Sequence, residues 1–155
     1  KKSGNNNFHH AKNLFMDYDY QQTNFSKAVL AGLFAGIAAT LANLLYDYVY
    51  RDITSYWPSE IINVSSIIVA TTLLLTVAGI IFHLFRQYIK NGSTGYFIFF
   101  TALTALCIYG ALHVQRSSDP VVTIEFRQLL LGVVIISGAA ALLIPYLYRH
   151  SKIFC

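Results

Sequence analysis

Residues 27–51 read KAVLAGLFAGIAATLANLLYDYVYR, an apolar stretch with a row of small and polar residues along one side. The members of this row, which we call the polar face, follow one another by four, four, three and four positions: Gly32, Gly36, Thr40, Asn43 and Asp47. At about 100° per residue they share one narrow side of a helix. In hydrocarbon, small residues at this spacing let a second helix approach closely, and polar side chains find partners inside the protein. The stretch therefore predicts a membrane-spanning helix that packs through its polar face.

The composition of the whole chain also indicates a membrane protein. Of its 155 residues, 55% are hydrophobic and only 12% are charged, against about a quarter charged in soluble domains. Three further apolar stretches follow the first, so we predict an all-α, polytopic membrane protein with a four-transmembrane-helix bundle. The expected helices run over about 27–50, 60–90, 94–114 and 120–148 within a membrane domain of residues 27–149. A polar tail of residues 1–26 and a short tail of residues 150–155 flank this domain.

Two local signals refine the second and fourth helices. Ser59 is expected to cap the second helix, with Glu60 in its first turn. Pro145 lies inside the fourth helix and predicts a kink over residues 141–145, unless a neighbouring group compensates for the missing backbone donor. The second helix has a polar face of its own, made by Ser65, Thr72, Thr76, Gly79 and His83. We expect the Gly32 to Thr40 part of the first helix to meet this second face, or the small residues of the fourth helix.

The distribution of Lys and Arg residues predicts the orientation of the chain. With four spans, eight basic residues fall on the side of the two tails: Lys1, Lys2, Lys12, Lys27, Arg86, Lys90, Arg149 and Lys152. The other side has three, Arg51, Arg116 and Arg127. By the positive-inside rule, both tails are expected in the cytoplasm. Because these residues flank apolar stretches and form no patch with interleaved aromatic residues, no nucleic-acid partner is expected.

The polar residues of the helices favour packing over catalysis. Asp47 and Arg51 lie one helical turn apart, so we expect a structural ion pair. The alternative is that Asp47, together with Asn43, binds an ion or a substrate. His83 and His113 are expected near opposite membrane surfaces, which argues against a shared metal or haem site. We therefore predict no enzyme activity, no catalytic residue, no bound metal and no cofactor.

The polar tail of residues 1–26 is predicted to contact a partner. A segment of this composition, rich in Asn and poor in aliphatic residues, buries too little apolar surface to offset its ordering entropy by itself. Its apolar anchors are spaced for docking on a neighbouring surface: Phe8, Leu14, Phe15, Tyr18 and Tyr20. The alternative is that the tail lies along the helix ends of its own chain.

The glycine- and alanine-rich first helix, its aromatic and acidic end, and the following PSEIINVSSII resemble small four-helix bacterial inner-membrane proteins without an assigned function. The resemblance covers about residues 27–90, implies a four-span fold and supplies no activity or site. We expect the chain in a bacterial inner (cytoplasmic) membrane. A small subunit of an organellar respiratory complex, in an organellar inner membrane, is the alternative.

Two functions remain for a chain of this kind. We expect a non-enzymatic accessory or scaffold subunit that binds other membrane protein subunits within the lipid bilayer. The alternative is a small channel or transporter that works as a homo-oligomer, with the polar faces lining the path of an ion or small solute. A transport path needs these faces around a wet cavity, whereas a scaffold needs them dry and packed.

Overall fold

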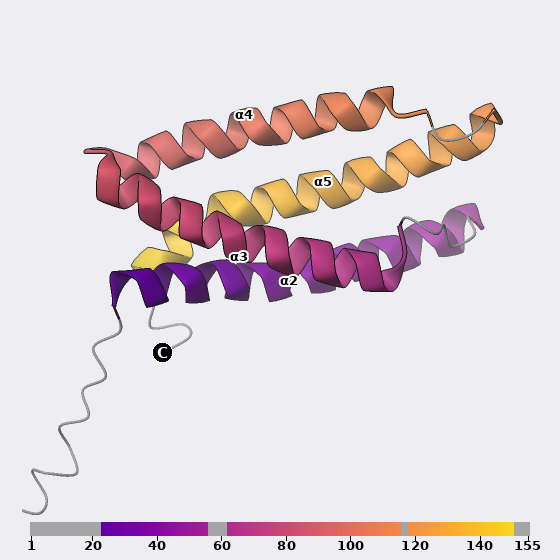
Figure 1. The fold of residues 1–155 in the computed structure, drawn as a ribbon. Helices are drawn as coiled ribbons and strands as arrows, with labels where there is room; N and C mark the ends of the chain where they lie inside the picture. The colour runs from indigo at the N-terminus through magenta and orange to yellow at the C-terminus, as the bar shows by residue number, and fades with distance from the viewer. Residues whose placement is uncertain (1–22, 56–61, 116–117, 151–155) are drawn as a thin grey trace, which may run out of the picture.

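The computed structural model describes residues 23–55, 62–115 and 118–150. Its described part consists of four α-helices, each long and apolar enough to cross a membrane (Figure 1). In chain order these are α2 (Asn24–Thr54), α3 (Val64–Tyr88), α4 (Gly92–His113) and α5 (Pro120–Arg149). The predicted all-α fold of four transmembrane helices is confirmed, and the chain is a multi-pass membrane protein.

The predicted helix ends differ from the observed ones by a few residues. The start of α3 was expected at residue 60 and lies at Val64. Asn63 caps this helix in place of Ser59, which is outside the described residues: Asn63 Oδ1 accepts from the Ser66 amide at 2.8 Å, and Ser66 Oγ accepts from the Asn63 amide at 3.0 Å. This reciprocal capping box satisfies two N–H groups. It explains the later start.

The other helix ends also differ from the expected ones. Helix α2 starts three residues earlier than 27 and extends four residues beyond 50, and Thr23 Oγ1 accepts from the Ser26 amide at its start. Helix α3 ends at Tyr88 instead of residue 90, and α4 occupies 92–113 instead of 94–114. Helix α5 begins at Pro120 as expected and ends one residue later than expected.

Helices α2 and α3 pack backbone against backbone. A Cβ atom added to Gly32 would lie 2.6 Å from the Leu75 carbonyl oxygen and 2.9 Å from the Gly79 Cα. Small residues line the buried side of α2 above and below this contact: Ala28, Ala31, Ala35 and Ala39. Without side chains between them, the two helices come close enough for their polar groups to meet.

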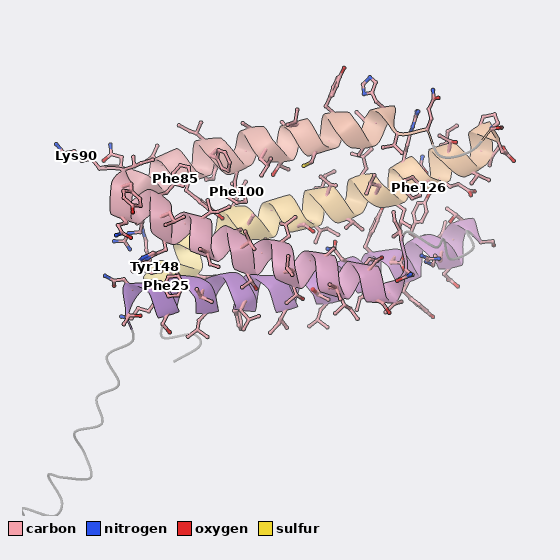
Figure 2. The ribbon with its side chains drawn as sticks, in the orientation of Figure 1. Phe25, Phe85, Lys90, Phe100, Phe126 and Tyr148 are labelled. Atoms are coloured by element: carbon pink, nitrogen blue, oxygen red, sulfur yellow. The ribbon has the colours of Figure 1, made fainter. Side chains whose placement is uncertain are left out.

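Helix α4 lies at the edge of the bundle, on the side away from α2 (Figure 1). Large aromatic side chains hold it against α3 and α5. Tyr96 is fully buried, and its ring makes edge contacts with Phe82 at 5.1 Å and Phe85 at 6.3 Å between ring centroids. Phe100 lies one turn further along α4 (Figure 2), with its centroid 4.4 Å from that of Tyr96. The described helices therefore form a tight α2–α3 pair with α5 beside it and α4 anchored by rings.

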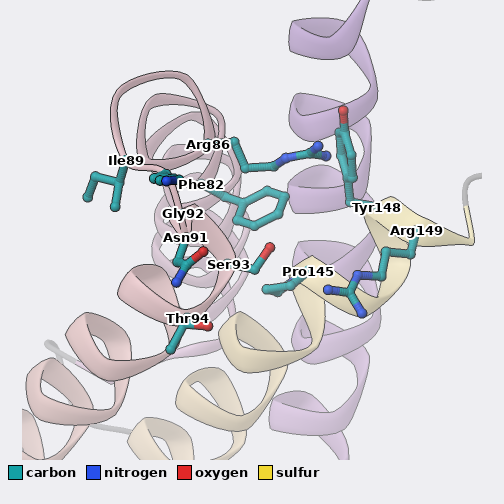
Figure 3. A pocket seen from close by; sticks show the side chains of 11 residues that line it. Phe82, Arg86, Ile89, Asn91, Gly92, Ser93, Thr94, Pro145, Tyr148 and Arg149 are labelled. Atoms are coloured by element: carbon teal, nitrogen blue, oxygen red, sulfur yellow. The ribbon is translucent and has the colours of Figure 1, made fainter.

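Helix α5 continues through Pro145 because a tyrosine from α4 supplies the missing donor. In an α-helix the carbonyl of residue 141 accepts from the N–H of residue 145, and proline has none. Here the Tyr96 hydroxyl donates to the Ala141 carbonyl at 2.9 Å, inside the protein. Beyond Pro145 the end of α5 bends toward the start of α2 (Figures 1 and 3). There the Tyr148 hydroxyl donates to Asn24 Oδ1 at 3.2 Å.

Candidate functional site

A buried polar cluster joins three of the helices at the polar face of α2. Asn43 is fully buried, and its Nδ2 donates to Thr71 Oγ1 of α3 at 3.1 Å and to Ser137 Oγ of α5 at 3.0 Å. Asn43 Oδ1 is also buried and has no hydrogen-bond partner within the described residues. Because an amide group in hydrocarbon must find its partners within the protein, this cluster fixes how α2, α3 and α5 fit together.

The remaining residues of the polar face also lie against α3. Thr40 and Thr72 bring their hydroxyl oxygens within 3.1 Å. A Cβ on Gly36 would lie 3.2 Å from the Thr72 Cα. Thr76, in contrast, donates to the Thr72 carbonyl of its own helix at 2.7 Å and is only half-buried. Sequence reasoning placed Thr76 in the interface but missed Thr71, the residue of α3 that holds Asn43.

An ion pair closes one end of the α2–α3 interface. Arg51 Nε lies 2.8 Å from Asp47 Oδ1, and Arg51 Nη2 donates to the Ile62 carbonyl at 3.0 Å, just before α3 begins. Asp47 is buried, although it lies in the last two turns of α2. Its carboxylate is therefore engaged by a cation of the same chain, an arrangement that ties the start of α3 to the end of α2.

Two tyrosines at this end fasten α2 to α5. The Tyr46 hydroxyl donates to the Gln128 carbonyl at 3.0 Å. The Tyr50 hydroxyl lies 3.1 Å from the Glu125 carbonyl oxygen and 3.0 Å from Gln128 Oε1. Gly132 faces the Tyr46 ring so closely that a Cβ there would overlap it. Tyr46 and Tyr50 are thus part of the helix packing.

The histidines of the helices lie apart. His83 is at the same end as the start of α2, where its ring makes an edge contact with Phe25 at 5.3 Å. His113 is the last residue of α4 at the opposite end, where it stacks on Tyr109 at 4.2 Å. Within residues 23–55, 62–115 and 118–150, no group of three His, Cys, Asp or Glu side chains is placed to hold a metal ion.

A basic pocket that sequence reasoning did not single out lies near the short α3–α4 connection (Figure 3). It has a volume of about 410 Å³, and three of its lining residues carry a positive charge: Arg86, Lys90 and Arg149. Phe82, Pro145 and Tyr148 form its apolar and aromatic walls. In the sequence analysis these basic residues served only to predict orientation, because residues 86 and 149 are far apart in the chain.

The predicted partner contacts in the tail, Phe8, Leu14, Phe15, Tyr18 and Tyr20, lie outside the described residues. Ser65, the first member of the predicted polar face of α3, is exposed beside the Asp47 and Arg51 end of the bundle. The structure thus brings the α2 face together with Thr71, Thr72, Gly79 and Ser137, and leaves Ser65 outside this contact.

No protein-family model, no curated protein and no solved structure matches this chain. The resemblance to small bacterial inner-membrane proteins is therefore supported only at the level of four long apolar helices, and no family is identified.

Proposed function

We propose that this chain is a non-enzymatic scaffold or accessory subunit of a larger membrane protein complex. The observation that carries the proposal is the close packing of its polar face against α3 and α5. Gly32 and Gly79 bring α2 and α3 into backbone contact, and the amide nitrogen of Asn43 is occupied by Thr71 and Ser137. A group that conducts an ion or solute must face water at the middle of the membrane. These groups instead face one another.

The positions of the pockets among the described residues also favour a scaffold over a channel or transporter. Those with charged residues in their linings lie at the two ends of the bundle, around Arg86 and around Asp47. One pocket lies further along the bundle, between α3, α4 and α5, and has a volume of about 100 Å³. Apolar residues such as Leu74, Phe100 and Val134 line most of it. A channel or transporter would therefore need a path between copies of the chain.

The partner surface that we propose is the outer side of α4, together with the tail of residues 1–26. Helix α4 is the least buried of the four, and Ile98, Leu106 and Tyr109 are each more than 60% exposed. A Cβ on Gly110 would meet no atom within 4 Å. This helix has room on its outer side for a transmembrane helix of another subunit.

Affinity purification tests the scaffold proposal. The full chain, extracted in mild detergent through a carboxyl-terminal tag, is expected to carry the same membrane protein in a fixed ratio, as measured by mass spectrometry. Deletion of residues 1–22 is expected to reduce that ratio several-fold while the thermal unfolding of the four-helix domain stays unchanged. Recovery of a lone monomer from both forms would overturn the proposal, and recovery of a homo-oligomer alone would favour the transporter.

We also propose that both tails face the cytoplasm of a bacterial inner membrane. The fold supports a common side for the tails, because the start of α2 and the end of α5 lie at one end of the bundle (Figure 1). In a variant without the native Cys107 and Cys155, a cysteine at Ser55 or Ser118 is expected to react with a membrane-impermeant maleimide in intact cells. A cysteine at the exposed Asn91 is expected to react only after lysis. The reverse pattern would invert the orientation.

A further inference from the structure

The basic pocket is lined by positive charge from three parts of the chain. Arg86 comes from the last turns of α3, Lys90 from the connection, and Arg149 from the last turn of α5. Basic residues at helix ends often serve only to set orientation or to stabilise the helix C-terminus. Here residues from two separate helices line one pocket of about 410 Å³, which neither of those roles requires.

Arg86 is held in place by an aromatic ring. Its guanidinium carbon lies 4.7 Å from the centroid of the Tyr148 ring. Tyr148 is itself fixed by its bond to Asn24 and by an edge contact with Phe82 at 5.4 Å. Stacking occupies the face of a guanidinium and leaves its N–H donors, which lie in the plane, available. Figure 3 shows Arg86 reaching from α3 to this ring, and Arg149 on the last turn of α5.

No carboxylate lines the pocket among the described residues. The described acidic residues belong to the other end of the bundle, in the last turns of α2 and the first turns of α5: Asp47, Asp52, Asp119 and Glu125. A second pocket, of about 330 Å³, shares Arg86 and Tyr148 and adds Asn24, His83 and Gln87, and it also has no acidic residue in its lining. The charge of Arg86 and Arg149 is therefore uncompensated by the part of the chain that the structure describes.

The polar groups around the cations suit an anion with several oxygens. Asn91, Ser93 and Thr94 line the same pocket at the start of α4. The start of α4 lies close to α3 because Gly92 has no side chain, and a Cβ there would overlap the Phe85 carbonyl. A phosphate group matches the fork of a guanidinium and also accepts from hydroxyl groups.

We propose that this pocket binds the phosphate group of an acidic phospholipid. The pocket lies where α3 and α5, two membrane-spanning helices, end. This is the depth at which lipid headgroups surround the protein, so the lipid is the nearest source of phosphate. Basic pockets between transmembrane helices recognise acidic headgroups in this way. Arg86 and Arg149 bind the phosphate, and Tyr148 positions Arg86.

Lipid titration of the delipidated full chain in an uncharged detergent tests the site. By native mass spectrometry, phosphatidylglycerol is expected to bind about tenfold or more tightly than phosphatidylcholine. The double variant Arg86→Gln with Arg149→Gln is expected to lose this preference. Lys27→Gln removes a positive charge at the same end of the bundle but outside both pockets, and is expected to change the binding less than about twofold.

Two further variants distinguish lipid binding in the pocket from general attraction of the lipid to positive surface charge. Arg86→Lys keeps the charge but loses the planar fork, and is expected to weaken phosphatidylglycerol binding several-fold. Tyr148→Leu, which removes the ring beneath Arg86, is expected to do the same, whereas Tyr148→Phe is expected to retain the binding. Equal effects of Lys27→Gln and Arg86→Gln on phosphatidylglycerol binding would overturn the proposal that the lipid binds in the pocket. Binding of inorganic phosphate that Arg86→Gln weakens, without any lipid preference, would overturn the lipid as its source.

Discussion

Replacement of Gly79 by leucine is expected to separate α2 from α3 and destabilise the protein by about 3 kcal/mol or more. A Cβ on Gly79 would lie 2.5 Å from the Ala28 carbonyl oxygen and 3.0 Å from the Gly32 Cα. Both are backbone atoms, so no change of rotamer relieves the overlap. Thermal unfolding in mild detergent, followed together with size-exclusion chromatography, measures the effect.

The chain offers a matched control for this substitution. Gly110→Leu makes the same change on α4, where a Cβ meets nothing within 4 Å, and is expected to leave the unfolding temperature within a few degrees of the native value. Gly36→Leu is expected to fall between the two, because its nearest contact, the Thr72 Cα, would be 3.2 Å away. If Gly79→Leu unfolds at the same temperature as Gly110→Leu, the glycine contact does not hold the pair together.

Tyr96→Phe is expected to destabilise the protein by about 1–3 kcal/mol, although it removes a single oxygen atom. The ring contacts of Tyr96 with Phe82 and Phe100 remain, and only the hydrogen bond to the Ala141 carbonyl is lost. That carbonyl then lies buried without a donor, because Pro145 cannot supply one. Tyr109→Phe removes the hydroxyl of an exposed tyrosine on the same helix and is expected to have little effect.

A double-mutant cycle tests this explanation directly. In a Pro145→Ala background the backbone N–H of residue 145 can bond to the Ala141 carbonyl, so the loss of the Tyr96 hydroxyl is expected to cost much less there. Equal effects of Tyr96→Phe with and without the proline would show that the hydroxyl does not replace the missing donor. The free energy of unfolding of the four proteins gives the coupling.

The sequence predicted the number of helices and the packing face of α2, because the spacing of Gly32, Gly36, Thr40 and Asn43 fixes one side of a helix regardless of its partner. The partner residues on α3 were harder to predict. Thr71 and Thr72 are adjacent, and both reach α2, through Asn43 and Thr40 respectively. Adjacent residues of a helix point about 100° apart, so the helical repeat assigns only one of them to a given face. Because α2 and α3 are in backbone contact, both Thr71 and Thr72 nevertheless contact α2.

Other features depend on contacts between distant parts of the chain. No packing face was predicted for residues 94–114, and the structure shows that Tyr96 and Phe100 hold this helix, α4, in the bundle. The start of α3 was misjudged because Pro58, Ser59 and Glu60 form a common start signal. The Asn63 and Ser66 capping box that decides it was also present in the sequence. The basic pocket requires knowing that α3 and α5 end side by side.

The Asn43 cluster also bears on the order in which the protein assembles during synthesis. Thr71 follows Asn43 by 28 residues, whereas Ser137 follows it by 94. Helices α2 and α3 can therefore pair as soon as α3 has entered the membrane, through glycine contacts that need nothing from the rest of the chain. Asn43 Nδ2 gains its second acceptor, Ser137 Oγ, only when α5 leaves the ribosome and docks. Until then the half-built bundle exposes a polar group to lipid, and this favours docking of α5 at the correct position.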